Sequence, residues 1–249
     1  MTISSTFPYD GQLFKSSNKK YLETIFFVHF YEGSKTLMKR HIDLVNELGF
    51  DAFAFNLIST KEMLKNPLSK KNIFGIKHIW ADQIEFLLNS LPEDKILFSF
   101  SNPSSSAIES MYYRQCRDVK AMICDSGPSG KFITSFYNLL RYYKEKGMIE
   151  SLLKAVFTPI FWSQHLHKDM DTHLKSFPKN FPILSIRGWK DKLIPPDHID
   201  CVFEGHPQLM WRKLSLPKAG HLNGLKDFKE EYIQGVKLFL SEFATPISS

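Results

Sequence analysis

The stretch ILFSFSNPSSSAIES, from Ile96 to Ser110, decides the fold prediction because an apolar run ends abruptly at a cluster of serines. The apolar run has the character of a short buried strand, and residues 107–113 read as a helix. The serines therefore lie at a strand-to-helix turn. Open α/β folds place their chemistry at such turns, on the carboxyl edge of a parallel sheet. Ser101, which ends the run, is the first candidate nucleophile.

Strands and helices alternate along most of the chain, and this alternation predicts a mostly parallel sheet covered by helices on both faces. The run 24–30 is continuously apolar, as in strands buried on both faces. The predicted strands are 24–30, 50–57, 95–101, 119–126, 181–188 and 209–215, and the predicted helices are 34–49, 76–91, 107–113, 196–203 and 224–243.

One interruption of this alternation indicates a helical cap. Residues 131–176 contain helical patterns with no strand between them. We therefore expect a single α/β domain over residues 1–249 with a helical cap or lid insertion at 128–180. The insertion is rich in aromatic residues, which we expect either to form the core of the cap or to wall an apolar pocket.

Charge and cysteine content exclude several classes of function. The formal net charge is +6, but the basic residues are scattered beside acidic ones, so we expect no nucleic-acid partner and at most a mild preference for anionic substrates. Three cysteines without a CxxC pair indicate a reducing cytoplasm. We also expect no signal peptide and no transmembrane segment, because no apolar stretch approaches about 20 residues.

Two further strand ends carry residues that complement a serine. Asp191 follows the predicted strand 181–188, and His221 follows the strand 209–215. Parallel strands end at one edge of a sheet, so these side chains can converge with Ser101. A serine hydroxyl needs a base to take its proton, and histidine fits that role. A carboxylate on the second ring nitrogen would fix the tautomer of the histidine. The order Ser, Asp, His is the order of α/β-hydrolases.

The chain from about Thr24 to Phe243 resembles the α/β-hydrolase superfamily of serine esterases and lipases. GWKDKLIP (188–195) is similar to the acid loop of that family, AGHLNGL (219–225) to its histidine loop, and FFVHFYEG (26–33) to the strand that supplies one oxyanion donor. The resemblance implies a catalytic triad of Ser101, Asp191 and His221. It also implies an oxyanion hole formed by the backbone N–H groups of Phe30 and Asn102.

The nucleophile elbow departs from the family pattern. Ser99-Phe100-Ser101-Asn102-Pro103 stands where the family has G-x-S-x-G, and Pro103 disfavours the helical region for Asn102. Ser104 or Ser105 would be the nucleophile if the turn is displaced. Without catalysis, the serines would cap the following helix. Asp125, at the end of another strand, is the alternative triad acid.

HLHKDMDTH (165–173) is similar to a zinc motif of metallo-β-lactamases, with His165, His167 and Asp169 in register. Its final histidine is replaced by Met170, and the segment falls inside the predicted insertion. We interpret it as a polar face of a cap helix, and we expect no metal and no cofactor.

These features predict a serine hydrolase that cleaves an ester or thioester with an apolar acyl group through an acyl-enzyme. The alternative is a catalytically inactive binding protein on the same fold. The oligomeric state stays open. The residues that we expect around the substrate are His29, which is expected mainly to hold the oxyanion loop by a hydrogen bond, and Tyr31, Phe136, Phe161 and Trp162.

Overall fold

Seven strands form one sheet in the computed structural model, which describes residues 7–247. Their order across the sheet is β1-β3-β2-β4-β5-β6-β7. β1 runs antiparallel to β3, and the other neighbours are parallel. This confirms the predicted mostly parallel sheet. The strands are β1 Gln12–Phe14, β2 Thr24–Val28, β3 Asp51–Ala54, β4 Lys95–Phe100, β5 Val119–Asp125, β6 Pro182–Gly188 and β7 Met210–Leu216.

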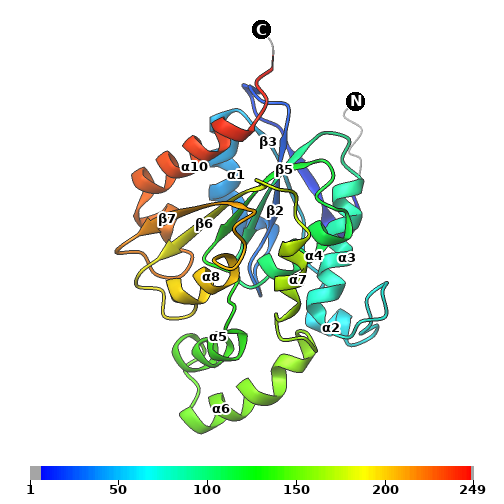
Figure 1. Ribbon diagram of the computed structural model, residues 1–249, viewed down its shortest axis with the longest axis vertical. Helices are drawn as coiled ribbons and strands as arrows, with labels where there is room; N and C mark the ends of the chain where they lie inside the picture. The colour runs from blue at the N-terminus through cyan, green and yellow to red at the C-terminus, as the bar shows by residue number, and fades with distance from the viewer. Residues whose placement is uncertain (1–6, 248–249) are drawn as a thin grey trace.

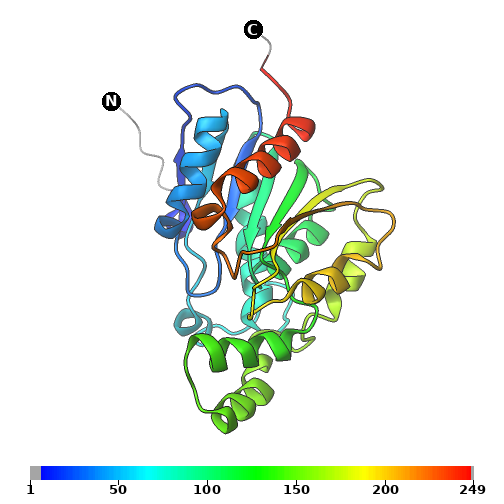
Figure 2. The same cartoon turned by 90° about the vertical axis from the view of Figure 1, so that its left-hand side faces the viewer.

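Helices cover both faces of the sheet because the central strands are apolar on both faces. Alternate residues of β2 enter two separate apolar clusters, Ile25 and Phe27 on one face and Phe26 and Val28 on the other. The face of Ile25 is covered by α1 Lys39–Leu48 and α10 Lys229–Phe243, and the opposite face by α3 Ile76–Asn89, α4 Ser104–Tyr113, α7 Asp169–Lys175 and α8 Pro196–Phe203 (Figures 1 and 2).

The observed elements match the predicted ones to within a few residues, with three differences. The short edge strand β1 was not predicted. α4 begins at Ser104, three residues before the predicted start, so the serine cluster forms its first turn. The predicted helix 224–243 is divided into α9 Gly224–Asp227 and α10, because Phe228 leaves the helical region with φ −133° and ψ 50°.

Only helical elements connect β5 to β6, at the carboxyl end of the sheet. They are α5 Phe132–Asn138, the π-helical turn η3 Leu139–Tyr143, α6 Met148–Phe157, the 3₁₀ turn η4 Thr158–Phe161 and α7. Figure 1 shows α5 and α6 projecting beyond the strands. The last helix behaves differently, since Met170 and Leu174 of α7 join the apolar cluster that contains Ile108 and Met111 of α4. The connection thus returns to the main core before β6 begins.

Shorter helical segments complete the description. They are η1 Pro8–Asp10, η2 Lys35–Met38 and α2 Thr60–Met63. Among residues 7–247, every helix is too short or too polar to cross a membrane.

A glycine allows the loop after β5 to lie directly against the end of β4. A Cβ atom at Gly127 would lie 2.5 Å from the carbonyl carbon and oxygen of Ser101. Heavy atoms do not approach that closely without a shift of the backbone, so Gly127 is required where it stands.

We therefore expect Gly127→Ala to destabilise the fold by about 1–3 kcal/mol, the usual cost of overpacking. Gly147→Ala is the matched control, because no atom lies within 4 Å of a Cβ built there. The control should change the free energy of unfolding by less than about 0.5 kcal/mol. Urea denaturation measures both values, and equal stability of the two variants would contradict the close approach at Ser101.

Candidate active site

Ser101 lies in a strained turn between β4 and α4. Its N–H donates to the carbonyl of Asp125 at 2.8 Å, which extends the β4–β5 pairing by one residue. Its own φ is +57°, a left-handed value that is uncommon for a residue with a side chain. The Ser101 carbonyl then accepts the N–H of Ser104 at 3.1 Å, as α4 begins. Such strain concentrates at functional sites.

His221 reaches Ser101 from the loop after β7. The Ser101 Oγ lies 3.1 Å from the His221 Nε2. Two hydrogen bonds hold this loop: the N–H of Lys190 donates to the carbonyl of Ala219 at 2.8 Å, and the N–H of Gly220 donates to the Asn223 Oδ1 at 2.8 Å. The first of these ties the loop to the segment that carries Asp191.

Asp191 completes a hydrogen-bonded chain with Ser101 and His221. Its Oδ2 lies 2.7 Å from the His221 Nδ1, and its Oδ1 accepts the N–H groups of Leu193 and Ile194 at 2.8 and 2.9 Å. The carboxylate has no proton to give, so Nδ1–H donates to it and Nε2 accepts the serine hydroxyl. The structure thus brings together the three residues that were predicted from the sequence to lie at three separate strand ends.

The alternative candidates lie away from this chain of hydrogen bonds. Asp125 Oδ2 accepts the Tyr232 hydroxyl at 2.6 Å, and its Oδ1 accepts the Ser126 hydroxyl at 2.8 Å. Ser105 donates to the carbonyl of Asn102 at 2.8 Å, and the buried Ser104 hydroxyl has no partner among the described residues. Within residues 7–247, Ser101 is therefore the serine that contacts His221.

The backbone N–H groups of Phe30 and Asn102 are the two predicted oxyanion donors. Phe30 and Asn102 both line the cavity that contains Ser101 and His221. Neither backbone N–H donates to a protein acceptor within residues 7–247. Both donors are therefore free for an oxygen atom in the cavity.

The expectation that His29 lines the substrate pocket was wrong. The side chain is buried under the oxyanion loop, where Nδ1–H donates to the Phe30 carbonyl at 2.8 Å and Nε2 accepts the Leu57 N–H at 3.0 Å. Burial lowers its pKa, with a smaller opposing effect of the Phe30 bond. Both ring nitrogens are used to hold the loop, which leaves none for a substrate.

A cavity of about 330 Å³ lies above Ser101. Such a volume is typical of small-molecule sites. Tyr31, Phe136, Phe161 and Trp162 line it, as expected from the sequence. The sequence did not single out several other lining residues, because they come from four different segments and share no local pattern: Ile76, Leu139, Pro159 and Leu193.

The zinc-like motif does not converge on a metal site. His167 donates from Nδ1–H to the Ser129 carbonyl at 2.8 Å, and the Trp162 indole N–H donates to its Nε2 at 2.6 Å. Burial, followed by the nearby Lys77 charge, lowers the pKa of His167 to about 3. This histidine is therefore a neutral structural residue with both nitrogens used.

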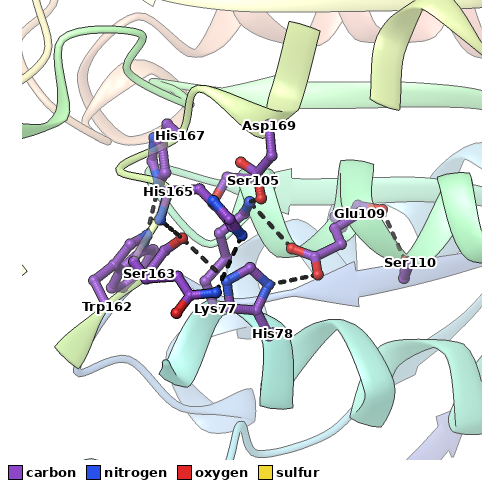
Figure 3. Close-up of polar contacts among 12 residues, drawn as sticks. Lys77, His78, Ser105, Glu109, Ser110, Trp162, Ser163, His165, His167 and Asp169 are labelled. Atoms are coloured by element: carbon purple, nitrogen blue, oxygen red, sulfur yellow. Dashed lines mark hydrogen bonds and ion pairs between the residues drawn. The ribbon is translucent and has the colours of Figure 1, made fainter. Parts of the chain in front are cut away.

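A buried cluster on α3, α4 and α7 nevertheless has metal-like spacing. Ligand atoms of His78, Glu109 and Asp169 all lie within 4.8 Å of one another. The Lys77 ammonium contacts both carboxylates, at 3.1 Å from Glu109 and 2.5 Å from Asp169 (Figure 3). The cluster thus contains a cation of its own. His78 extends it to the returning cap segment, with Nδ1 2.6 Å from Glu109 and Nε2 3.0 Å from the Ser163 hydroxyl.

The neighbouring groups lower the pKa of both carboxyls of this cluster, although burial opposes this. Burial would raise the pKa of Glu109, but the His78 hydrogen bond, the Lys77 charge and the Tyr113 hydroxyl lower it to about 2. Burial would likewise raise the pKa of Asp169, and Lys77 lowers it. The cluster therefore fastens α7 to α3 and α4 through charged groups, of which only Asp169 is partly exposed.

Comparison with solved structures identifies the architecture. An esterase from Pyrococcus furiosus matches with a TM-score of 0.65 and 17% identity, covering 94% of this chain and 86% of that one. A hydrolase from Oleispira antarctica matches at 0.64 and 13% identity, covering 93% and 94%. A monoacylglycerol lipase from Paleococcus ferrophilus matches at 0.60 and 14% identity, covering 94% and 98%. The chain has the α/β-hydrolase fold. No protein-family model and no curated protein matches the sequence.

We expect Lys77→Met to destabilise the protein by about 3–5 kcal/mol, because it leaves two buried carboxylates without their counter-charge. Lys175→Met is the control, on helix α7. The ion pair of Lys175 with Asp171 is exposed to solvent and should contribute little to the stability of the fold. Chemical denaturation measures both. A similar small change in the two variants would show that the Lys77 cluster does not hold the fold.

The buried carboxyl of Asp125 should make the free energy of unfolding depend on pH. Burial raises its pKa from 3.8 to about 6, despite the opposing hydrogen bonds from Tyr232 and Ser126. The folded state therefore holds this proton more tightly than the unfolded state. The resulting stability is complete below about pH 4 and is lost as the pH rises through about 6.

We expect the stability of Asp125→Asn relative to the wild type to increase by about 3 kcal/mol between pH 4 and 7, since two pKa units correspond to that free energy. Denaturation curves over this pH range provide the measurement. A difference between the two proteins that stays constant with pH would contradict the raised pKa.

Proposed function

We propose that this protein is a serine hydrolase that cleaves an ester, or a thioester, with an apolar acyl group. The observation that carries the proposal is the hydrogen-bonded chain Ser101–His221–Asp191 at the base of an aromatic cavity. The likeness to two proteins named as an esterase and a monoacylglycerol lipase supports ester chemistry on this fold.

The geometry supports an acyl-enzyme route. The Ser101 Oγ attacks the substrate carbonyl carbon while His221 Nε2 accepts its proton. The negative oxygen that forms lies between the N–H groups of Phe30 and Asn102, and each such donor contributes about 2.7–4 kcal/mol in related enzymes. Asp191 stabilises the imidazolium, which then gives the proton to the leaving oxygen or sulfur.

Water completes the cycle. His221 removes a proton from a water molecule, which attacks the acyl-enzyme carbonyl, and the same proton returns to the Ser101 Oγ as the acid leaves. His221 carries the same number of protons at the beginning and at the end of the catalytic cycle. The proton transfers therefore balance without a cofactor.

The cavity supports the apolar acyl group. Its walls are mainly aromatic and aliphatic, and its one lysine, Lys144, is paired with Glu32. An apolar chain can replace water against such walls, which favours binding by about 25 cal/mol per Å² buried. The cap residues Leu139, Tyr143, Phe161 and Trp162 would select the chain length.

The first test is intact-mass analysis after treatment with a fluorophosphonate. We expect one adduct on the wild type and none on Ser101→Ala, because the probe reacts with activated serines. Ser104→Ala and Ser105→Ala are matched controls in the same turn and should retain the adduct.

Ester hydrolysis is then measured over a series of acyl lengths. We expect Ser101→Ala to lower kcat/KM by about 10³-fold or more, as removal of the nucleophile does in other serine hydrolases. A folded wild type that takes no adduct and cleaves no ester would contradict the proposal and favour the inactive binding protein.

A further inference from the structure

Helix α6 presents its apolar side to solvent. In a helix that packs on a core, the apolar stripe faces inward. Here the buried positions are the small residues Ser151 and Ala155, while the large apolar side chains of the helix are between 55% and 72% exposed. Those exposed residues are Met148, Ile149, Leu152, Leu153, Val156 and Phe157. We call this set the α6 face.

The exposed apolar residues of the α6 face lie side by side. Its members recur at helical spacing, so they form one contiguous stripe. Neighbouring residues extend it, since Tyr142, Tyr143, Ile160 and Phe161 are also exposed. Large apolar patches on soluble domains mark surfaces that bind another apolar surface.

The α6 face is continuous with the cavity above Ser101. Tyr143 and Phe161 are each about half exposed, and both line the cavity. Figures 1 and 2 show α5 and α6 at the end of the molecule away from the two chain termini, where they project from the sheet. An apolar path therefore leads from the outer surface of the cap to the reactive serine.

Basic side chains accompany this apolar stripe. Residues 141–157 contain four basic residues against two acidic ones, Glu145 and Glu150. Glu150 lies between Lys146 and Lys154, at 3.7 and 2.7 Å. Glu32 pairs with Lys144, so together with Glu32 the four basic residues face three acidic ones. The patch thus combines apolar side chains with a small net positive charge, which is the charge that an anionic lipid surface attracts.

We infer that the α6 face docks the protein on the surface of an anionic lipid bilayer. The stripe would enter the boundary between headgroups and acyl chains, and the lysines would contact lipid phosphates. A second copy of this chain would also cover the mouth of the cavity, but unlike a bilayer it would bring no acyl ester to it. Docking itself does not depend on catalysis, but the entry of an acyl ester from the bilayer into the cavity rests on the proposed function.

Vesicle flotation with Ser101→Ala tests docking separately from hydrolysis. We expect this protein to float with phosphatidylcholine vesicles that contain about 30% phosphatidylglycerol, and to bind pure phosphatidylcholine about tenfold more weakly. Absence of binding to both vesicles by the folded protein would overturn the inference, whatever the outcome of the fluorophosphonate experiment.

A pair of double variants locates the surface. Ile149→Glu/Phe157→Glu, placed in the Ser101→Ala protein, should weaken vesicle binding by about tenfold or more, because two charges would enter an apolar boundary. Leu22→Glu/Leu238→Glu is the matched control, since those leucines are 49% and 66% exposed outside the cap. The control should bind like its parent.

Two results would overturn the assignment of this surface. One is an equal loss of vesicle binding in both double variants, with both folded by circular dichroism. The other is a dimer in light scattering that does not bind vesicles and that Ile149→Glu/Phe157→Glu dissociates. That second result would assign the α6 face to self-association.

Discussion

The left-handed turn at Ser101 is the constraint on which the site depends. It places a serine hydroxyl at the end of β4, within 3.1 Å of the His221 Nε2. The turn exists only because the surroundings fix it: the β4–β5 pairing continues through the Ser101 N–H, α4 begins three residues later, and Gly127 leaves room for the backbone. Each of these elements is in turn held by the large apolar core, so the site inherits the rigidity of the sheet.

The non-glycine elbow is compatible with this turn. Pro103 is buried with φ −56° and ψ −16°, immediately before α4, where its missing N–H removes no helical hydrogen bond. Ser99 is fully buried, and its hydroxyl donates to the Ile123 carbonyl at 3.2 Å. A small polar residue thus fills the position two residues before Ser101, because a backbone acceptor on β5 satisfies its hydroxyl.

Helix α6 presents an apolar surface, whereas the segment that follows it is held by charged contacts as well as by apolar ones. In the returning segment after α6, Asp169 pairs with the buried Lys77, which also contacts Glu109. Ser163 contacts the buried His78, and Trp162, Met170 and Leu174 join the apolar core. Because these contacts hold α7 and Ser163, the large apolar residues of α6 are not needed for packing. They are free to form the α6 face and the rim of the cavity.

The sequence alone determined the sheet and the three residues at its edge. Ser101, Asp191 and His221 each follow a predicted strand, so the shared edge of a parallel sheet was enough to bring them together. Only the tertiary structure decided which way other side chains face. His29 is held beneath the oxyanion loop by Leu57, Lys77 finds carboxylates from α4 and α7, and α6 turns its apolar side outward. The physical reason is that periodicity gives the faces of an element, whereas its neighbours determine which face is buried.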